Sequence, residues 1–330
     1  MPWIPARGGE RATQLRRPYD SDMTRRAVVT GVFSYTGGAI ARQLLDRGDD
    51  VVSLSRRPAP PGHPLAGAVP REPLQFDDPE QLVRSLEAVD VLFNTYWIRF
   101  PRDGADFASA IANSRALFEA ARRAGVRTIV HLSVTNAAAD SPYAYFRGKA
   151  EVEAALAETT HDHAVIRPSL VFGGREEILI NNMAWLLRKL PAYAVPGDGS
   201  YRVQPVFVGD VAGLAIAAAQ GASPILQDAV GPEIYTFDEF LGALARALHT
   251  RSRLVHLPPA VVAALGRAIG PLVRDVLITA EELGALTSEL LISHQPATGH
   301  TSFGEWLPGA APWLGRRYAN ELHRNWAETG

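Results

Sequence analysis

The stretch "AVVTGVFSYTGGAI" (residues 27–40) decides the fold that we expect for this chain. It opens with an apolar, β-branched run at 27–30, which is typical of a buried strand. Small residues then recur at three-residue spacing through 31–37, and a helical pattern begins at Tyr35. A glycine-rich turn between a strand and a helix N-terminus suits the phosphates of a dinucleotide, because backbone N–H groups and the helix dipole face the anion there. We therefore predict a phosphate-binding turn here, in preference to a glycine-rich connection without a ligand.

Five residues of this turn are predicted to contact the cofactor. Gly31 permits a tight turn, and Gly37 permits a close approach of helix to strand. Ser34 replaces the middle glycine of the three-glycine pattern, and its hydroxyl can cap the helix or bond a phosphate oxygen. Phe33 and Tyr35 flank that serine and complete the predicted set.

Past this turn, short apolar runs alternate with longer helical patterns. Strands are expected at 51–55, 74–76, 89–95, 127–135 and 164–172, and helices at 35–47, 104–124 and 142–158. Such alternation produces right-handed βαβ units and a parallel sheet. The predicted fold class is α/β, a Rossmann-type doubly wound parallel sheet with a smaller, mainly helical C-terminal lobe.

The domain boundaries follow from changes in this pattern. Residues 1–24 are rich in Arg, Pro and Gly, so we expect a disordered leader or a mis-called start, with Met23 as the other start. Residues 25–220 are predicted to form the dinucleotide-binding domain, with 174–204 partly contributing to the substrate lobe. Residues 221–330 are predicted to form the smaller C-terminal substrate lobe.

The composition narrows the class of protein. The chain has 330 residues, of which 33 are basic and 35 acidic, and its net charge of -2 argues against a general nucleic-acid binder. It has no cysteine, which excludes disulfides, thiolate metal sites and a cysteine nucleophile. We predict a cytoplasmic protein with a small-molecule substrate, and both monomer and homodimer stay open.

Two further features have simple interpretations. The longest apolar stretch, 259–280, is interrupted by two arginines and an aspartate, so we expect an amphipathic helix pair and no integral membrane span. The histidines at 161 and 163 have no third ligand close by in the sequence, so we predict a solvated loop and no metal site.

The end of the second strand indicates which dinucleotide is bound. An NAD site expects an acidic residue there, but the sequence reads "SLSRRP" (53–58). Arg56 and Arg57 suit a 2′-phosphate, because a guanidinium makes charge-assisted, bidentate bonds to it. We predict NADP, with NAD as the second choice. The alternative is that the two arginines only solvate a loop.

Tyr145 and Lys149 carry the strongest chemical signal. The chain has only two lysines among its 33 basic residues, and Lys149 stands four residues after a tyrosine, on the same helix face. A free tyrosine has a pKa of about 10, and a nearby ammonium lowers that pKa towards neutral pH. Arginine has a rigid, planar fork and cannot give up a proton. The pair is therefore a candidate acid/base unit, and the alternative is a plain surface pair on a helix.

These motifs together resemble the extended or atypical short-chain dehydrogenase/reductases, including the NAD-dependent epimerase/dehydratase-like proteins. The matching segments are "TGVFSYTGG" (30–38), "FNTY" (93–96), "HLSVT" (131–135), "YFRGK" (145–149), "IRPSLVFG" (166–173) and "PVFVGDVA" (205–212). They span about 26–215, whereas the C-terminal lobe is similar only in general layout.

The resemblance implies roles for individual residues. It makes Tyr145 the general acid/base and Lys149 its helper, which also holds the nicotinamide ribose. The other implied cofactor contacts are Asp77 at the adenine, the loop of Asn94, Thr95 and Tyr96, and Pro168 and Leu170 near the nicotinamide amide.

The third catalytic group of that family is a Ser or Thr just past the fifth strand. Here Ser133 and Thr135 flank Val134, which falls at the expected position. We choose Ser133, with Thr135 in reserve.

Two functions follow from these residues. The first, which the intact pair of Tyr145 and Lys149 favours and which we expect, is an NAD(P)-dependent oxidoreductase or epimerase that acts on a small hydroxyl or carbonyl compound. The second is a non-catalytic NAD(P)H-binding redox sensor or accessory subunit, which the departure at Val134 and the altered glycine pattern favour.

Overall fold

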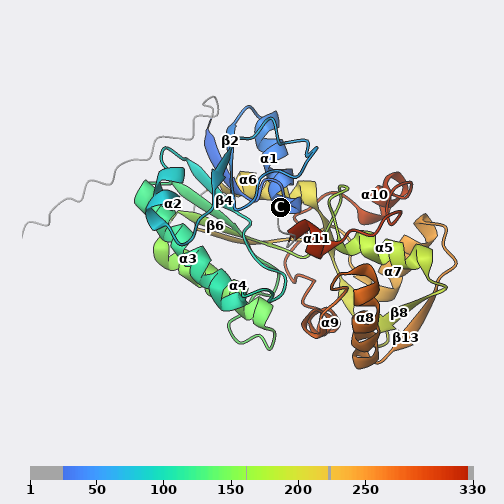
Figure 1. Ribbon diagram of the computed structural model, residues 1–330. Coiled ribbons are helices and arrows are strands. Elements are labelled where there is room, and N and C mark those ends of the chain that lie inside the picture. The colour runs from blue at the N-terminus through green and yellow to red at the C-terminus, as the bar shows by residue number, and fades with distance from the viewer. Residues whose placement is uncertain (1–24, 161, 222–223, 326–330) are drawn as a thin grey trace, which may run out of the picture.

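The computed structural model describes residues 25–160, 162–221 and 224–325, and these form two lobes side by side (Figure 1). The leader expected at 1–24 lies outside the described residues. Over the described part of the chain, no helix combines the length and apolar character that crossing a membrane requires.

The first lobe is built on a parallel sheet that has seven strands within the described residues. Its strands are β1 (Arg26–Thr30), β2 (Asp50–Ser55), β3 (Arg71–Pro73), β4 (Val91–Asn94), β5 (Thr128–Leu132), β6 (His163–Pro168) and β11 (Ile225–Ala229). Their order in the sheet is β11-β6-β5-β4-β1-β2-β3. The chain thus begins in the middle, builds towards β3 and then crosses back to β4. A dinucleotide binds at such a switch point, beyond the carboxyl ends of the two central strands.

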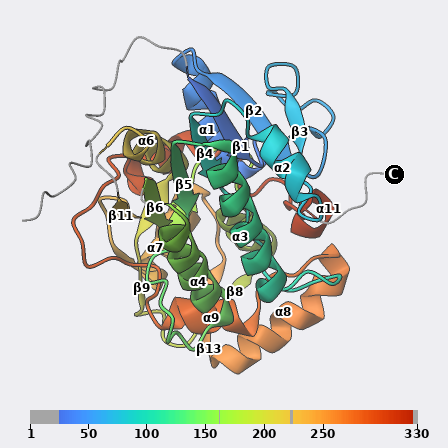
Figure 2. The same ribbon diagram turned by 90° about the vertical axis from the view of Figure 1, so that its left-hand side faces the viewer.

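Helices cover both faces of this sheet (Figure 2). One face carries α2 (Pro79–Ser85), α3 (Phe107–Ala124) and α4 (Ala144–Thr159), and the other carries α1 (Tyr35–Asp46) and α6 (Val208–Ala218). Alternate residues of each strand point to opposite faces. Val28 of β1 accordingly packs in the core under α3, and Val29 packs in the core under α1 and α6. This arrangement confirms the predicted doubly wound fold.

The second lobe is mainly helical and packs around its own aromatic core. Its helices are α5 (Leu179–Lys189), α7 (Phe237–Ala247), α8 (Pro259–Val273), α9 (Ala280–Thr287) and α10 (Phe303–Ala310). Short strands join them: β7 (Leu170–Phe172) with β10 (Pro205–Phe207), β8 (Ala192–Pro196) with β13 (Arg253–Leu257), and β9 (Arg202–Val203) with β12 (Tyr235–Thr236). Phe240 and Phe303 stack at 4.7 Å in the centre of this core.

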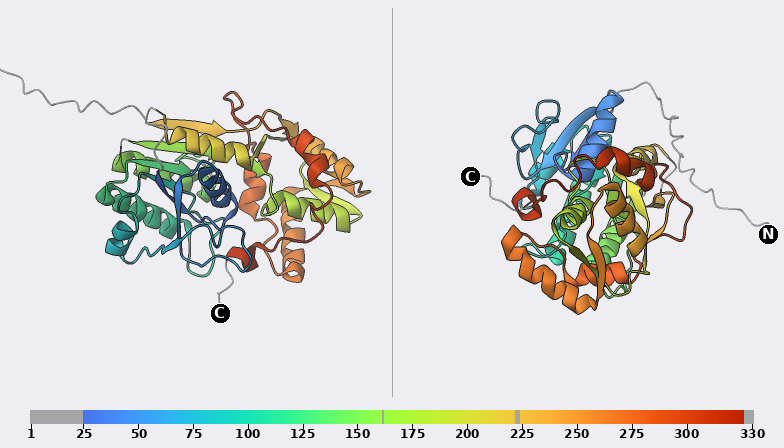
Figure 3. Two further views of the ribbon diagram at one scale, coloured as in Figure 1. Left: turned by 90° about the horizontal axis from the view of Figure 1, so that it is seen from above. Right: turned by 90° about the vertical axis from the view of Figure 1, so that its right-hand side faces the viewer.

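The two lobes are not formed by two continuous halves of the chain, because two segments lie outside the lobe that their position in the sequence suggests. The segment from α6 to β11 returns to the first lobe, so the large sheet extends to Ala229, past the expected boundary at 220. The last helix, α11 (Glu321–Asn325), lies between the two lobes (Figures 1 and 3). β11 has a weak sequence signal because it is a half-exposed edge strand, and an edge strand lacks the apolar run of a central one.

Candidate functional site

The glycine turn has the geometry that a pyrophosphate requires. Gly31 has a φ of +69°, a left-handed conformation that favours glycine. A Cβ on Gly37 would lie 2.3 Å from the carbonyl oxygen of Gly31, so only glycine lets α1 begin this close to β1. Ser34 is the exposed N-cap of α1, and its side chain makes no capping hydrogen bond. The turn therefore fits a phosphate group, with the Ser34 hydroxyl at its rim.

Thr30, which the sequence analysis did not single out, connects this turn to the loop that follows the neighbouring strand β4. Its hydroxyl oxygen accepts hydrogen bonds from the backbone N–H groups of Thr95 (2.7 Å) and Tyr96 (3.0 Å). The Thr95 hydroxyl donates back to the Thr30 carbonyl at 2.5 Å. The sequence did contain a signal for this role, because Thr30 is a hydroxyl residue at the end of a strand and directly precedes Gly31.

Asn94 is fully buried beneath this loop. Its side-chain oxygen accepts from the Thr30 hydroxyl (3.2 Å), and its side-chain nitrogen lies 3.1 Å from Nδ1 of His131. The amide thus orients the loop that was predicted to pass beside the cofactor.

The end of β2 carries cations without an acid. Arg56 is exposed and Arg57 half-buried, and the Ser55 hydroxyl donates to the Arg57 carbonyl at 2.8 Å. Asp77 is exposed past β3, next to Asp78, which caps α2.

The rings of Phe76 and Tyr96 lie 4.8 Å apart, and this contact joins the chain past β3 to the loop past β4. The segment that carries Asp77 therefore lies beside the loop of Asn94, Thr95 and Tyr96.

Lys149 is buried and turned towards the sheet. It is 3% exposed, and its Nζ donates to the carbonyl of Leu132 at 2.7 Å. Its ammonium also lies 4.8 Å from the centroid of the Trp97 ring, a cation–π contact. Burial lowers the pKa of Lys149 to about 7, and the carboxylate of Glu153 partly opposes that shift.

Tyr145 lies in an aromatic cluster on the same helix face. Trp97 stacks on Phe107 at 5.8 Å and meets the edge of Tyr145 at 6.0 Å. Burial raises the pKa of Tyr145 well above its ordinary value, and the charge of Glu282 adds to the rise. Burial thus acts in the direction opposite to the effect expected from Lys149.

The hydroxyl residues near the expected position of the third catalytic group are hydrogen-bonded to other parts of the protein. The Ser133 hydroxyl donates to Glu153, which is also paired with Arg167. The Thr135 hydroxyl donates to the Leu290 carbonyl at 2.8 Å. Val134 is the residue of this segment that packs in the apolar cluster with Tyr145. A methyl-bearing side chain therefore stands where the family pattern has a hydroxyl.

The remaining predicted contacts lie around the loop that joins the lobes. The carbonyl of Pro168 accepts from the N–H of Thr135 at 3.1 Å, while Leu170 is buried in the core of the second lobe. Phe33 packs its ring against His63 at 5.2 Å. The hydroxyl of Tyr35 is buried without a hydrogen-bond partner among the described residues.

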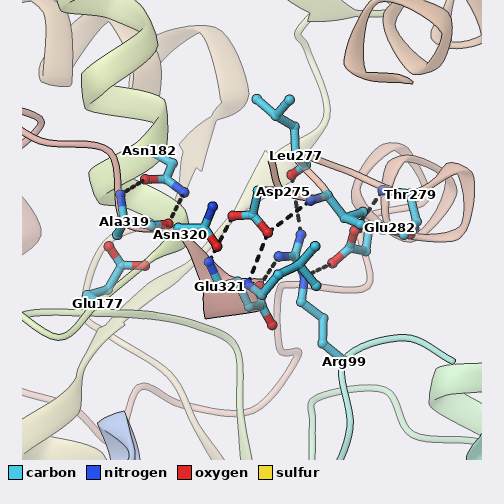
Figure 4. A network of polar contacts seen from close by, with 12 residues as sticks. Arg99, Glu177, Asn182, Asp275, Leu277, Thr279, Glu282, Ala319, Asn320 and Glu321 are labelled. Atoms are coloured by element: carbon cyan, nitrogen blue, oxygen red, sulfur yellow. Dashed lines mark hydrogen bonds and ion pairs between the residues drawn. The ribbon is translucent and has the colours of Figure 1, made fainter. Parts of the chain in front are cut away.

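A polar network that the sequence did not predict binds the second lobe to the loop past β4 (Figure 4). Arg99 binds the carboxylates of Glu282 on α9 and Glu321 on α11. Burial disfavours its charge, but the two carboxylates outweigh burial and raise the pKa of Arg99. Asp275 completes the network, because it accepts from the Tyr318 hydroxyl (2.9 Å) and the Glu321 N–H (2.8 Å).

Comparisons with known proteins agree with this geometry. A family model described as the NAD dependent epimerase/dehydratase family matches residues 27–229. The NADH dehydrogenase (ubiquinone) 1 alpha subcomplex subunit 9, mitochondrial, of Arabidopsis thaliana is 24% identical over 81% of this chain and 71% of its own length. Its Dictyostelium discoideum counterpart is 27% identical over 55% of this chain and 51% of its own length.

A solved structure shows the same fold. The triphenylmethane reductase of Citrobacter sp., complexed with NADP(H), matches with a TM-score of 0.69 and 18% identity. The match covers 87% of this chain and 99% of that one. The family model spans well over half of the chain, and the phosphate turn has the geometry that a nicotinamide dinucleotide needs. The chain therefore belongs to the NAD dependent epimerase/dehydratase family.

Proposed function

We propose that this protein is a non-catalytic NADP(H)-binding protein of the cytoplasm, an accessory subunit or redox sensor. The observation that carries the proposal is the position of Lys149, whose ammonium binds the Leu132 carbonyl and is covered by Trp97. An ammonium held in this way is engaged with the protein, so it is not poised to hold a ribose or to tune Tyr145.

Two further observations support this proposal. The pKa of Tyr145 is raised by burial, which makes the phenol a poorer base at neutral pH. The residue packed in the cluster with Tyr145 is Val134, which has no hydroxyl to bind a substrate oxygen. The named subunits among its relatives belong to an NADH dehydrogenase, and this accords with a role in an assembly.

An NAD(P)-dependent oxidoreductase or epimerase is the second candidate. One observation favours it: Tyr145 and Lys149 lie on one face of α4, and Lys149 reaches the carboxyl end of β5. A substrate would be a small hydroxyl or carbonyl compound, with Tyr145 moving the proton and the nicotinamide supplying or accepting the hydride.

Titration and turnover with the same four proteins separate these functions. The parent, Tyr145→Phe, Lys149→Met and Lys189→Met are titrated with NADPH. They are then assayed with a panel of ketones, quinones and sugar nucleotides. Lys189 is the matched control, since it is the other lysine of the chain and is exposed. We expect affinities within about twofold of the parent for all three variants, and bound NADPH that stays reduced.

Turnover by the parent that Tyr145→Phe abolishes would establish the enzyme instead. A selective loss of NADPH affinity in Lys149→Met, with Lys189→Met unchanged, would show that the lysine holds the ribose.

A further inference from the structure

The outer face of α8 exposes an apolar stripe to solvent. Val261, Leu265, Ala268 and Leu272 have the spacing i, i+4, i+7 and i+11, which places them along one side of the helix. Leu272 is 83% exposed, Val261 42% and Leu265 41%. The opposite side of α8 packs on α9 and on the β8–β13 pair through Val262 and Ala263. The stripe therefore does not serve the core of the lobe.

Neighbouring side chains extend this stripe into a larger surface. Val255 of β13 is 40% exposed, and it shares a face of the strand with Leu257, which packs against α8. Arg253 on the same face and Arg267 on α8 are both exposed. We call these residues, with the apolar stripe, the α8 surface. Figures 1 and 2 show α8 along the lower edge of the second lobe, away from the dinucleotide-binding sheet.

The chain segment that carries the α8 surface is basic. Between Glu239 and Asp275 the sequence has five arginines and no acidic residue. The acids of the adjoining elements are engaged: Glu281 accepts from the Tyr145 N–H at 2.7 Å, Glu282 binds Arg99, and Asp238 pairs with His256 of β13 at 2.8 Å. A surface that combines exposed leucines with the exposed Arg253 and Arg267 complements an anionic, partly apolar partner.

We propose that the α8 surface docks the protein on an anionic lipid bilayer. A helix with an apolar stripe and flanking arginines lies in the plane of a membrane interface, where leucines enter the acyl boundary and cations meet lipid phosphates. Leu272 lies in the last turn of α8, which ends at Val273, and it is the most exposed residue of the stripe, so this leucine forms the deepest contact. The first lobe then faces away from the membrane, with its dinucleotide site open to the solvent.

Vesicle co-sedimentation of the full chain tests this proposal. We expect binding to vesicles of phosphatidylcholine with phosphatidylglycerol, and at least about tenfold weaker binding to phosphatidylcholine alone. Each arginine near such a surface contributes about fivefold to the partition coefficient. Arg253→Gln combined with Arg267→Gln should therefore weaken binding by roughly twenty-fold, and 0.5 M salt should weaken it too.

Leu272→Glu is the decisive variant, and Leu226→Glu is its matched control. Leu226 is 56% exposed on the edge strand β11 of the other lobe, so both substitutions place a carboxylate at a solvent-exposed leucine. Leu272→Glu should reduce vesicle binding at least about tenfold and leave the melting temperature unchanged, whereas Leu226→Glu should bind like the parent. Absence of vesicle binding by the parent, or equal binding by both variants, would overturn the proposal. A parent dimer that Leu272→Glu converts to a monomer, without vesicle binding, would assign the surface to a second copy of the chain.

Discussion

Arg99 and Glu321 lie 222 residues apart in the sequence, yet the guanidinium of one binds the carboxylate of the other at the junction of the two lobes. Arg99 follows β4 in the sheet lobe, and Glu321 opens the last helix. The same guanidinium binds Glu282 of α9, so one side chain connects three segments of the chain.

Removal of this guanidinium should destabilise the protein. Arg99→Met leaves the carboxylate of Glu321, which is 8% exposed, without its counterion, and breaking such a buried pair costs about 3 kcal/mol of unfolding free energy. Arg115→Met is the matched control, because Arg115 also pairs with two glutamates but at an exposed site. Its cost should be below about 1 kcal/mol. Chemical denaturation measures both, and equal losses would contradict a special role for Arg99.

A methyl group on Gly37 should disrupt the phosphate turn. Its Cβ would meet the Gly31 carbonyl at 2.3 Å, so α1 must move away from β1. We expect Gly37→Ala to weaken NADPH binding at least about tenfold, or roughly 1.4 kcal/mol, as measured by fluorescence titration. Gly67→Ala serves as the control, since nothing lies within 4 Å of its Cβ. Unchanged affinity for Gly37→Ala would place the phosphates elsewhere.

Cofactor preference should depend on Arg56. If Arg56 or Arg57 binds a 2′-phosphate, NADPH should bind at least about tenfold more tightly than NADH, or roughly 1.4 kcal/mol. Arg56→Asp should narrow or reverse this preference. Arg251→Asp should not, because Arg251 is exposed in the second lobe, in the loop before β13. An NADH preference in the parent would contradict the assignment.

Gly148 should be required by the position of Trp97. A Cβ on Gly148 would lie 3.0 Å from Cη2 of that indole, so Gly148→Ala must displace the ring at a cost of about 1–2 kcal/mol. In a Trp97→Leu background the same substitution should cost less, and this double-mutant cycle measures the contact. Gly309→Ala in α10, whose Cβ meets nothing within 4 Å, should instead stabilise by about 0.5 kcal/mol. Additive effects of the Gly148 and Trp97 substitutions would exclude the contact.

Glu177 should give the protein a pH-dependent stability. Burial raises its pKa to about 7, and hydrogen bonds from the Ile180 and Asn181 N–H groups oppose that shift. The unfolded carboxyl loses its proton near pH 4.5. Between these values the folded state holds more protons, so this group's contribution to stability falls as the pH rises from 4.5 to 7.

Glu177→Gln removes that titration and keeps a side-chain acceptor for the N-terminus of α5. Relative to the parent, it should gain roughly 3 kcal/mol of unfolding free energy between pH 4.5 and 7 and remain constant above pH 7. Denaturation at several pH values measures the difference. A flat difference for Glu177→Gln would contradict the burial effect.

The sequence determined the parallel sheet and the phosphate turn because their signals are local. A strand reveals itself by its apolar run, and the turn needs Gly31 and Gly37 for backbone reasons that nearby residues impose. The family resemblance rests on these same segments. It therefore covers residues 26–215, and beyond them the chain is similar to the family only in general layout.

Only the tertiary structure decided which groups the side chains of the candidate site contact. The spacing of Tyr145 and Lys149 is the same whether the ammonium faces a ribose or a backbone carbonyl. Its direction is set by Trp97, which comes from a different strand end. The pairing of Arg99 with Glu321 likewise depends on the path of the whole second lobe. Contacts between residues that are distant in the sequence produce no periodic pattern in that sequence. Whether the side chains of a motif face a ligand site or are buried in the core therefore depends on tertiary packing.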